Sequence, residues 1–132
     1  MHSSKESSED YLESILSLGE ILPVVRAVDI SNDLGYKKSS VSIAMKKLKD
    51  NGYITVSPQG YISLTDSGRE IAETIYERHK FLTRLLMTLG VDELTATNDA
   101  CRIEHVISPE SFEALKNFIS KNVKLVDEPD HY

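Results

Sequence analysis

Hydrophobic residues recur every three or four positions along most of the chain, and this spacing predicts a mainly helical protein. In the first half, the pattern predicts helices over about Ser8–Leu18, Val28–Leu34 and Ser39–Asp50. We expect Gly19 to end the first helix, and Gly35 fits the C-terminal cap of the second. The buried face of the third helix is expected to consist of Val41, Ala44, Met45 and Leu48.

The spacing changes between residues 53 and 64, where two β-rich segments surround a turn. Tyr53–Val56 and Tyr61–Leu64 are rich in aromatic and β-branched residues, and Ser57–Gly60 between them contains proline and glycine. These segments predict a β-hairpin. Two short helices followed by a hairpin are the order of a winged helix-turn-helix, in which the second helix reads the major groove of DNA.

The second half is expected to be helical. Thr65 caps a long helix that reaches about Leu89, a further helix spans about Asp92–Val106, and Ser108 with Pro109 begins the last one. Their expected buried residues are Ile71, Ile75, Leu82, Leu86 and Leu89, then Phe112, Leu115, Phe118 and Ile119. We expect the tail from residue 123 to be loose. The sequence predicts a winged helix-turn-helix domain over residues 1–65 and an all-helical domain over 66–132.

Composition limits the classes of function. The 132 residues are 40% hydrophobic and 27% charged, which is typical of a globular protein. No apolar run is long enough to span a bilayer, and the start lacks the apolar core of a signal peptide. Cys101 is the single cysteine, so no internal disulfide can form. We therefore expect a cytoplasmic protein with no membrane partner.

Charge is distributed unevenly along the chain. The net charge of −6 argues against a wholly basic surface for nucleic acid. Residues 23–65, however, carry a net charge of +3, whereas residues 1–22 carry −4 and residues 66–132 carry −5. The basic segment coincides with the predicted helix-turn-helix and hairpin. A local DNA-binding surface is therefore compatible with the negative net charge of the whole chain.

The outer side of the predicted reading helix is rich in lysine and serine. Lysines neutralise phosphates, and small hydroxyl side chains let a helix approach the bases closely. Lysines on an exposed helix can equally form an ordinary solvated face, but the order of the elements favours DNA binding. The hairpin Gly52–Leu64 contains no Lys or Arg, so a wing contact would need hydroxyl, amide or backbone groups. The DNA-facing residues are predicted to be Lys37, Lys38, Ser39, Ser40, Ser42, Ile43, Lys46 and Lys47.

The acidic ends contain six possible metal ligands, namely Asp10, Glu13, His79, Cys101, Glu104 and His105. The first two lie three positions apart and share a helix face, and the last three share a face at spacing i, i+3 and i+4. Each residue alone has an ordinary structural role, such as helix capping, a small buried thiol or a hydrogen-bonded core histidine. Together they combine sulfur, imidazole and carboxylate groups with matching periodicity, which indicates a metal site outside the DNA-reading segment.

Several segments together resemble one family. Asn98–Ser108, which reads NDACRIEHVIS, closely resembles the signature of the diphtheria toxin repressor family, whose members are repressors that respond to Fe(II) or Mn(II). Glu9–Ile15 resembles the first helix of that family, Glu77–His79 its long-helix histidine motif, and Gly90–Asp92 the turn before its ligand helix. The resemblance extends over nearly the whole chain.

The resemblance implies a dimer whose N-terminal domain binds DNA and whose C-terminal helices pair and bind metal. Arg26 and Ala27 match phosphate-contact positions of the family. In manganese-type members, a second metal site would use Glu13 and His79 and share two ligands with the first. The primary ligands implied are Asp10, Cys101, Glu104 and His105.

Iron-type members imply a different role for one residue. In those members, the residue at the position of His79 belongs to a separate ancillary metal site. Thr83 and Asn98 occupy two further positions of that site in this chain, so the ancillary site looks degraded here. The resemblance also implies the two-domain form of the family, without the SH3-like third domain that many iron-type members carry.

The implied ligand set is a hybrid of two types. Iron-type members usually have methionine where Asp10 stands, and manganese-type members usually have glutamate where Cys101 stands. Oxygen ligands favour Mn(II) or Fe(II), whereas a thiolate favours Fe(II), Co(II) or Zn(II). We expect one or two Mn(II) or Fe(II) ions per subunit and leave the choice between them open.

The resulting hypothesis is a metal-dependent repressor that binds a palindromic operator as a homodimer, controls metal homeostasis and has no small-molecule substrate. The main alternative is a metal-independent winged-helix regulator that senses a small molecule or redox state. A metalloenzyme is disfavoured, because the sequence has no Gly-rich phosphate loop or nucleophile motif. A dimerisation protein without DNA binding is a further alternative.

Overall fold

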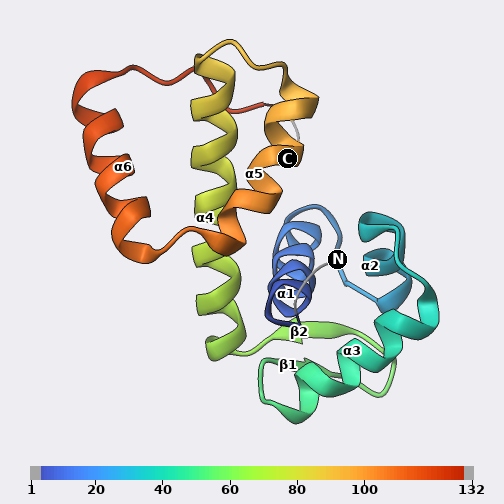
Figure 1. Ribbon diagram of the computed structural model, residues 1–132. Coiled ribbons are helices and arrows are strands. Elements are labelled where there is room, and N and C mark those ends of the chain that lie inside the picture. Colours follow the sequence, from blue (N-terminus) through green and yellow to red (C-terminus); the bar gives the residue numbers. More distant parts are fainter. Residues whose placement is uncertain (1–3, 130–132) are drawn as a thin grey trace. The chain divides into compact units, whose positions relative to one another are not determined.

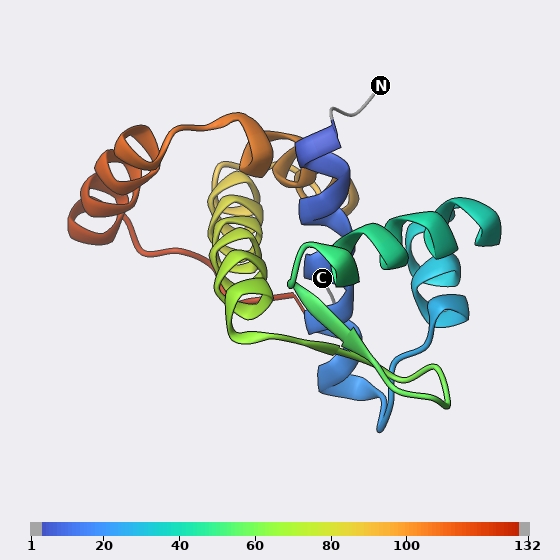
Figure 2. The same cartoon turned by 90° about the horizontal axis from the view of Figure 1, so that it is seen from below.

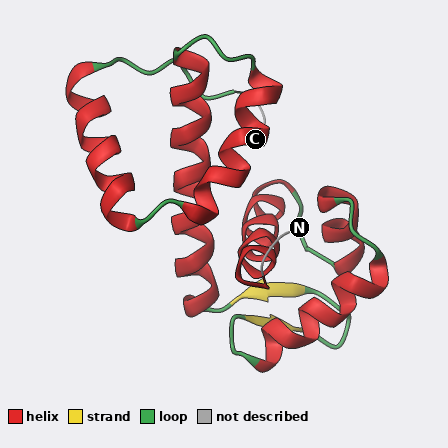
Figure 3. Cartoon of the chain, viewed as in Figure 1, coloured by secondary structure: helices red, strands yellow, loops and turns green. Residues whose placement is uncertain are grey.

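The computed structural model describes residues 4–129, and helices dominate it (Figure 3). Two compact units make up the chain, the first ending at Thr74 and the second beginning at Ile75. The boundary lies inside the long helix α4 (Asp66–Thr88), which therefore contributes to both units (Figure 1). The expected fold class is confirmed: a winged helix-turn-helix with one small hairpin is followed by a helical domain.

The first unit contains α1 (Ser4–Ile21), α2 (Ala27–Leu34), α3 (Lys38–Asp50) and the hairpin strands β1 (Ile54–Val56) and β2 (Ile62–Leu64). Helix α1 packs against α2, α3 and β2. Among the side chains of this unit that are fully buried, the largest are Leu12, Ile30, Val41 and Ile54. On α3, Val41, Met45 and Leu48 are buried as predicted, and Ala44 is half-buried.

The prediction that Gly19 ends the first helix is wrong, because α1 continues to Ile21. A glycine inside a helix costs only about 1 kcal/mol, so by itself it does not end one. A C-terminal glycine cap needs the left-handed conformation, which Gly35 adopts with φ 71° and Gly19 does not. The predicted cap at Gly35 is therefore confirmed.

The hairpin is antiparallel, with Ile54 opposite Leu64 and Val56 opposite Ile62. The chain before α2 adds a further ladder contact, because the N–H of Ile62 donates to the carbonyl of Val25 at 2.8 Å. Strand β1 also packs against α3, and Figure 2 shows the hairpin beside that helix. The hairpin is thus held on both sides, as a wing beside a reading helix.

Thr65 joins the hairpin to α4, as the predicted cap requires. Its Oγ1 accepts from the N–H of Gly68 at 3.2 Å and donates to the carbonyl of Gly52 at 2.7 Å. Its own N–H donates to the carbonyl of Tyr53 at 3.0 Å. The first turn of α4 is therefore tied to the segment that enters the hairpin.

The second unit contains the rest of α4 together with α5 (Glu93–Val106) and α6 (Pro109–Asn122). Both predicted starts are confirmed. The carboxylate of Asp92 accepts from the N–H of Thr95 at 3.1 Å, and the hydroxyl of Ser108 accepts from the N–H of Ser111 at 3.1 Å. The hydrogen bond from Thr95 lowers the pKa of Asp92 below its ordinary value of 3.8.

The core of this unit joins all three helices, and Phe81 and Phe112 meet edge to face with ring centroids 5.5 Å apart. Two residues that we expected to be buried are exposed instead: Phe118 by 62% and Leu89 by 71%. Phe118 is one position before the buried Ile119 and so lies about 100° from it around the helix. Leu89 follows the end of α4. The buried cluster is Phe81, Leu82, Leu85, Ala100, Phe112 and Ile119.

The tail after α6 has no regular structure over residues 123–129, yet it is attached to α4. Arg84 Nε donates to the carbonyl of Val126 at 3.0 Å, and the N–H of Val126 donates to Thr88 Oγ1 at 3.0 Å. Leu125 packs against the core cluster. The expectation of a loose tail is therefore wrong for this segment, because main-chain hydrogen bonds and one apolar anchor hold it.

No helix within residues 4–129 combines the length and the apolar character that crossing a membrane requires.

Candidate metal centre and nucleic-acid interface

Helix α5 brings three possible ligands together. Cys101, Glu104 and His105 each offer one ligand atom, and these atoms lie within 4.8 Å of one another. The side chain of Glu104 is 0% exposed and that of His105 is 1% exposed, whereas Cys101 is half-buried. The spacing i, i+3 and i+4 places all three on one face, as the sequence pattern predicted.

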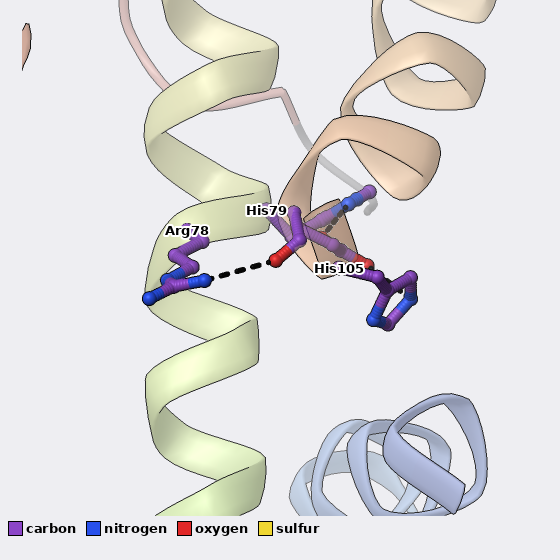
Figure 4. A network of polar contacts seen from close by, with 4 residues as sticks. Arg78, His79 and His105 are labelled. Atoms are coloured by element: carbon purple, nitrogen blue, oxygen red, sulfur yellow. Dashed lines mark hydrogen bonds and ion pairs between the residues drawn. The ribbon is translucent and has the colours of Figure 1, made fainter. Parts of the chain in front are cut away.

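Helix α4 adds an imidazole to this cluster. His79 Nδ1 lies 3.0 Å from Glu104 Oε2, and His105 Nε2 lies 3.4 Å from Glu104 Oε1. The carboxylate of Glu104 is therefore between two imidazoles from different helices; Figure 4 shows both rings.

The chemistry of this donor set fits a divalent transition metal. Burying a carboxylate is costly unless charged or hydrogen-bonding partners compensate for lost water. Here the partners are imidazoles, and a thiol lies within reach. Imidazole, thiolate and carboxylate together are typical ligands of iron, cobalt, zinc and manganese ions.

Arg78 is a residue of the centre that the sequence patterns did not reveal. Its Nη1 donates to the carbonyl of Glu104 at 3.2 Å and to the carbonyl of Ile107 at 3.0 Å (Figure 4). Its guanidinium also lies 5.4 Å from the ring centroid of Phe112. The available signal was weak: a cation beside His79, and a helix end whose carbonyls needed donors.

Asp10 and Glu13, the other two predicted ligands, belong to the first unit. They lie one turn apart on α1. Their role in metal binding stays a prediction.

The predicted DNA-facing residues of the first unit are all exposed on α3 and just before it. Ile43 is 71% exposed, which is notable for an isoleucine in the middle of a helix whose Val41 and Met45 are buried. The face thus presents cations, small hydroxyl groups and one aliphatic side chain. Its members are Lys37, Lys38, Ser39, Ser40, Ser42, Ile43, Lys46 and Lys47.

Arg26 lies just before α2 and contacts Tyr61 of the hairpin. Its backbone N–H donates to Asp29 Oδ2 at 2.9 Å, and Ala27 begins the helix. The guanidinium is 5.0 Å from the ring centroid of Tyr61, and Nη2 donates to the hydroxyl of Tyr61 at 3.3 Å. The hairpin has no Lys or Arg of its own, so Arg26 supplies a cation to it.

A winged helix-turn-helix with a lysine-rich reading helix, followed by a helical unit that gathers sulfur, nitrogen and oxygen donors, defines a metal-dependent DNA-binding regulator. The chain belongs to the iron-dependent repressor family. The model described as "Iron dependent repressor, N-terminal DNA binding domain" matches residues 4–61, and "Iron dependent repressor, metal binding and dimerisation domain" matches residues 65–124. This membership confirms the resemblance drawn from the sequence motifs.

Named relatives agree with this assignment. An uncharacterised HTH-type transcriptional regulator of Methanocaldococcus jannaschii is 39% identical over 118 residues, which are 88% of this chain and 94% of the relative. The transcriptional regulator MntR of Escherichia coli is 32% identical over 118 residues, which are 89% of this chain and 76% of the relative. The chain is thus a transcriptional regulator by family, not an enzyme.

Solved structures show the same fold. The manganese regulator SloR is 26% identical with a TM-score of 0.76, over 86% of this chain and 53% of that protein. The IdeR protein of T. acidophilum is 25% identical with a TM-score of 0.76, over 97% and 57%. A manganese-dependent transcriptional repressor in complex with manganese is 23% identical with a TM-score of 0.78, over 92% and 63%. The chain therefore spans between about half and two thirds of these three solved proteins.

Proposed function

We propose that this protein is a repressor that binds a palindromic operator as a homodimer when it is loaded with Mn(II) or Fe(II), and that it controls metal homeostasis. The observation that carries the proposal is the cluster of the half-buried Cys101 with the buried side chains of Glu104, His105 and His79, in a chain that also exposes a lysine-rich α3. A regulator of this kind acts where the DNA is, which agrees with a cytoplasmic location.

The proposed primary ligands are Asp10, Cys101, Glu104 and His105. Glu13 and His79 complete a second site that shares ligands with the first, giving one or two ions per subunit. The 3.0 Å contact between His79 and Glu104 supports this arrangement, because it joins His79 to the primary ligands within one unit. Thr83, which stands at a position of the iron-type ancillary site, is fully buried.

Bound metal supplies the positive charge that offsets the carboxylates of this ligand set. Glu104 and His105 on α5 and His79 on α4 form the part of the set contained in the second unit. Asp10 and Glu13 lie on α1, which packs against α2 and α3 of the DNA-binding unit. If Asp10 and Glu13 held the metal, they would restrain α1, against which the reading helix α3 packs.

The consequence is a coupling between metal and operator binding. Such allosteric couplings are typically on the order of 1–3 kcal/mol, and by linkage the operator must tighten metal binding by the same factor. In a symmetric dimer, two copies of α3 meet two half-sites of a palindrome. Exposed apolar side chains of the second unit, Leu89, Leu94 and Phe118, support self-association through that unit.

On the DNA, the lysines of α3 neutralise phosphates, and Arg26 and Ala27 approach the backbone at the start of α2. Ser39, Ser42 and Ile43 are the residues that we assign to base edges, with Ile43 suited to a thymine methyl group. All three residues are exposed, which supports this assignment.

The test is operator binding as a function of metal. A duplex would be selected from a random pool with Mn(II)-loaded protein, and its affinity would then be measured with Mn(II), Fe(II), Co(II), Zn(II) and chelator. We expect at least one metal to raise the affinity by about five- to 150-fold. Equal affinity with chelator and with every metal would refute the proposal, and a Ser40→Glu variant serves as the control for binding through α3.

A further inference from the structure

We propose that Arg78 is a positioning residue of the metal centre, which holds Glu104 and His105 in place through the main chain of α5. This inference rests on the proposed function, since it assumes that these residues bind metal. Arg78 itself offers no ligand atom, because a guanidinium only donates and stays charged.

The last carbonyls of a helix have no partner within the helix and need donors from elsewhere. At the end of α5, the N–H of Ile107 still donates to the carbonyl of Ile103 at 3.1 Å. Arg78 Nη1 donates to two of the carbonyls that follow, that of Glu104 at 3.2 Å and that of Ile107 at 3.0 Å. A cation at a helix C-terminus is also favoured by the helix dipole.

The guanidinium is itself held by the packing of the unit. It lies over the ring of Phe112, the N-terminal aromatic residue of α6, at 5.4 Å from the centroid. Phe112 is buried and meets Phe81 of α4 edge to face. Arg78 thereby joins α4, the end of α5 and the start of α6, so its two hydrogen bonds act from a fixed point.

Glu104 is consequently fixed from two sides by neighbouring residues of α4. His79 contacts its carboxylate, and Arg78 contacts its carbonyl. His105 follows directly on the same turn, whereas Cys101 lies one turn earlier. Loss of Arg78 should therefore loosen Glu104 and His105 as ligands while the position of the Cys101 thiolate is largely retained.

A merely structural role for Arg78 predicts a different result, namely reduced stability without a specific effect on metal. Lys116 provides the matched control. Its Nζ forms an ion pair with Glu77, which joins α6 to α4 and leaves α5 untouched. Arg78→Met removes a long cationic side chain from α4, and Lys116→Met removes one from α6. Each substitution keeps an apolar stem at its position.

The experiment measures Co(II) binding to the full chain by its absorbance, with visible ligand-field bands and a thiolate-to-Co(II) band in the near ultraviolet. Thermal unfolding of the metal-free chains is recorded in parallel. We expect Arg78→Met to lower the Co(II) affinity by about tenfold to a hundredfold and to alter the visible bands, while the thiolate band persists. Lys116→Met should stay within about twofold of the unaltered protein, a small effect on the scale of such supporting contacts.

The inference is overturned if Arg78→Met binds Co(II) as the unaltered protein does, or if Lys116→Met loses as much affinity at an equal loss of stability. If Arg78→Met does not fold, Arg78→Lys decides, because it keeps the charge but not the planar fork of donors. For Arg78→Lys, a loss of Co(II) affinity smaller than that expected for Arg78→Met, together with altered visible bands, supports the inference. Unchanged Co(II) binding by Arg78→Lys overturns it. An unaltered protein that binds no Co(II), Mn(II) or Fe(II) overturns the proposed function as well, so the two failures are distinguishable.

Discussion

His79 Nδ1 lies 3.0 Å from Glu104 Oε2, although the two residues are 25 positions apart and lie on different helices. Both side chains are at least nine-tenths buried. Removing one partner would therefore leave the other buried without this contact, in the metal-free unit as well as in the proposed metal sites.

We predict that His79→Leu lowers the free energy of unfolding of the metal-free protein by about 1–3 kcal/mol, because it removes a donor from a buried carboxylate. Urea unfolding measures this loss. In a double-mutant cycle with Glu104→Gln, the two losses should not add, since residues in contact share an interaction energy. Additive losses would show that the contact carries no energy.

Gly68 of α4 packs against the carbonyl of Tyr53, and a Cβ at residue 68 would lie 2.0 Å from that oxygen. We predict that Gly68→Ala destabilises the protein by roughly 1–3 kcal/mol, because backbone at the hairpin entry must move. Gly19 is the matched control, since a Cβ there meets nothing within 4 Å. Gly19→Ala should stabilise the helix interior by about 0.5–1 kcal/mol. Equal effects in thermal unfolding would contradict both statements.

Local patterns predicted much of the fold because its helix ends are encoded locally. The cap at Ser108 and the left-handed Gly35 depend on neighbours within four residues. Phe118 and Leu89 were expected to be buried and are not, because burial depends on which partner faces a helix, and spacing alone does not reveal that. Gly19 misled for the opposite reason: a helix end needs a conformation, not merely a residue type.

At the candidate site, too, the features within one helix were predictable and the contacts between helices were not. Spacing alone placed Cys101, Glu104 and His105 on one face, because they belong to one helix. The contact of His79 with Glu104 required knowledge of how α4 and α5 pack. Arg78 was missed because its partners are carbonyls 26 and 29 positions away, and every residue type has a carbonyl. Sequence patterns report side-chain chemistry and are blind to such main-chain acceptors.

Arg26 lies against Tyr61 of the hairpin, so we predict that Tyr61 tunes the DNA contact of Arg26. Arg26→Ala should weaken binding to all duplexes and reduce the slope of log affinity against log salt by about 1. Tyr61→Ala should give part of this loss, because an unstacked guanidinium is less ordered, and Tyr61→Phe should give less. Fluorescence anisotropy over a range of salt measures the slopes. Tyr61→Ala with an unchanged affinity and slope would refute the coupling.

The cap at Asp92 predicts a pH dependence. The hydrogen bond from Thr95 lowers the pKa of Asp92 in the folded protein, so its contribution to stability is present above the ordinary value of 3.8. It is lost as the pH falls through the lowered pKa. We expect Asp92→Ala to lower the unfolding temperature at pH 7, and the difference from the unaltered protein to narrow below pH 3.8. A difference that stays constant or widens in acid, in calorimetric scans, would contradict this cause.

Cys101 is the proposed ligand that departs from the all-oxygen and nitrogen set of manganese-type members. A thiolate favours Co(II) and Zn(II) over Mn(II) relative to a carboxylate, because softer ions bind sulfur more strongly. We predict that Cys101→Glu lowers the affinity for Co(II) and Zn(II) and keeps or raises that for Mn(II), as measured by competition titration. It should also remove the near-ultraviolet thiolate band of the Co(II) form.

Cys101→Ser separates the loss of sulfur from the gain of a carboxylate at the same position. If the carboxylate matters, Cys101→Glu should retain Mn(II)-dependent operator binding better than Cys101→Ser, because a hydroxyl is the poorer ligand for this hard cation. Equal Mn(II) dependence in both variants and in the unaltered protein would mean that residue 101 is not a ligand. Glu104 and His105 would then have to bind the regulatory metal without it, and the cluster on α5 would reduce to two ligands.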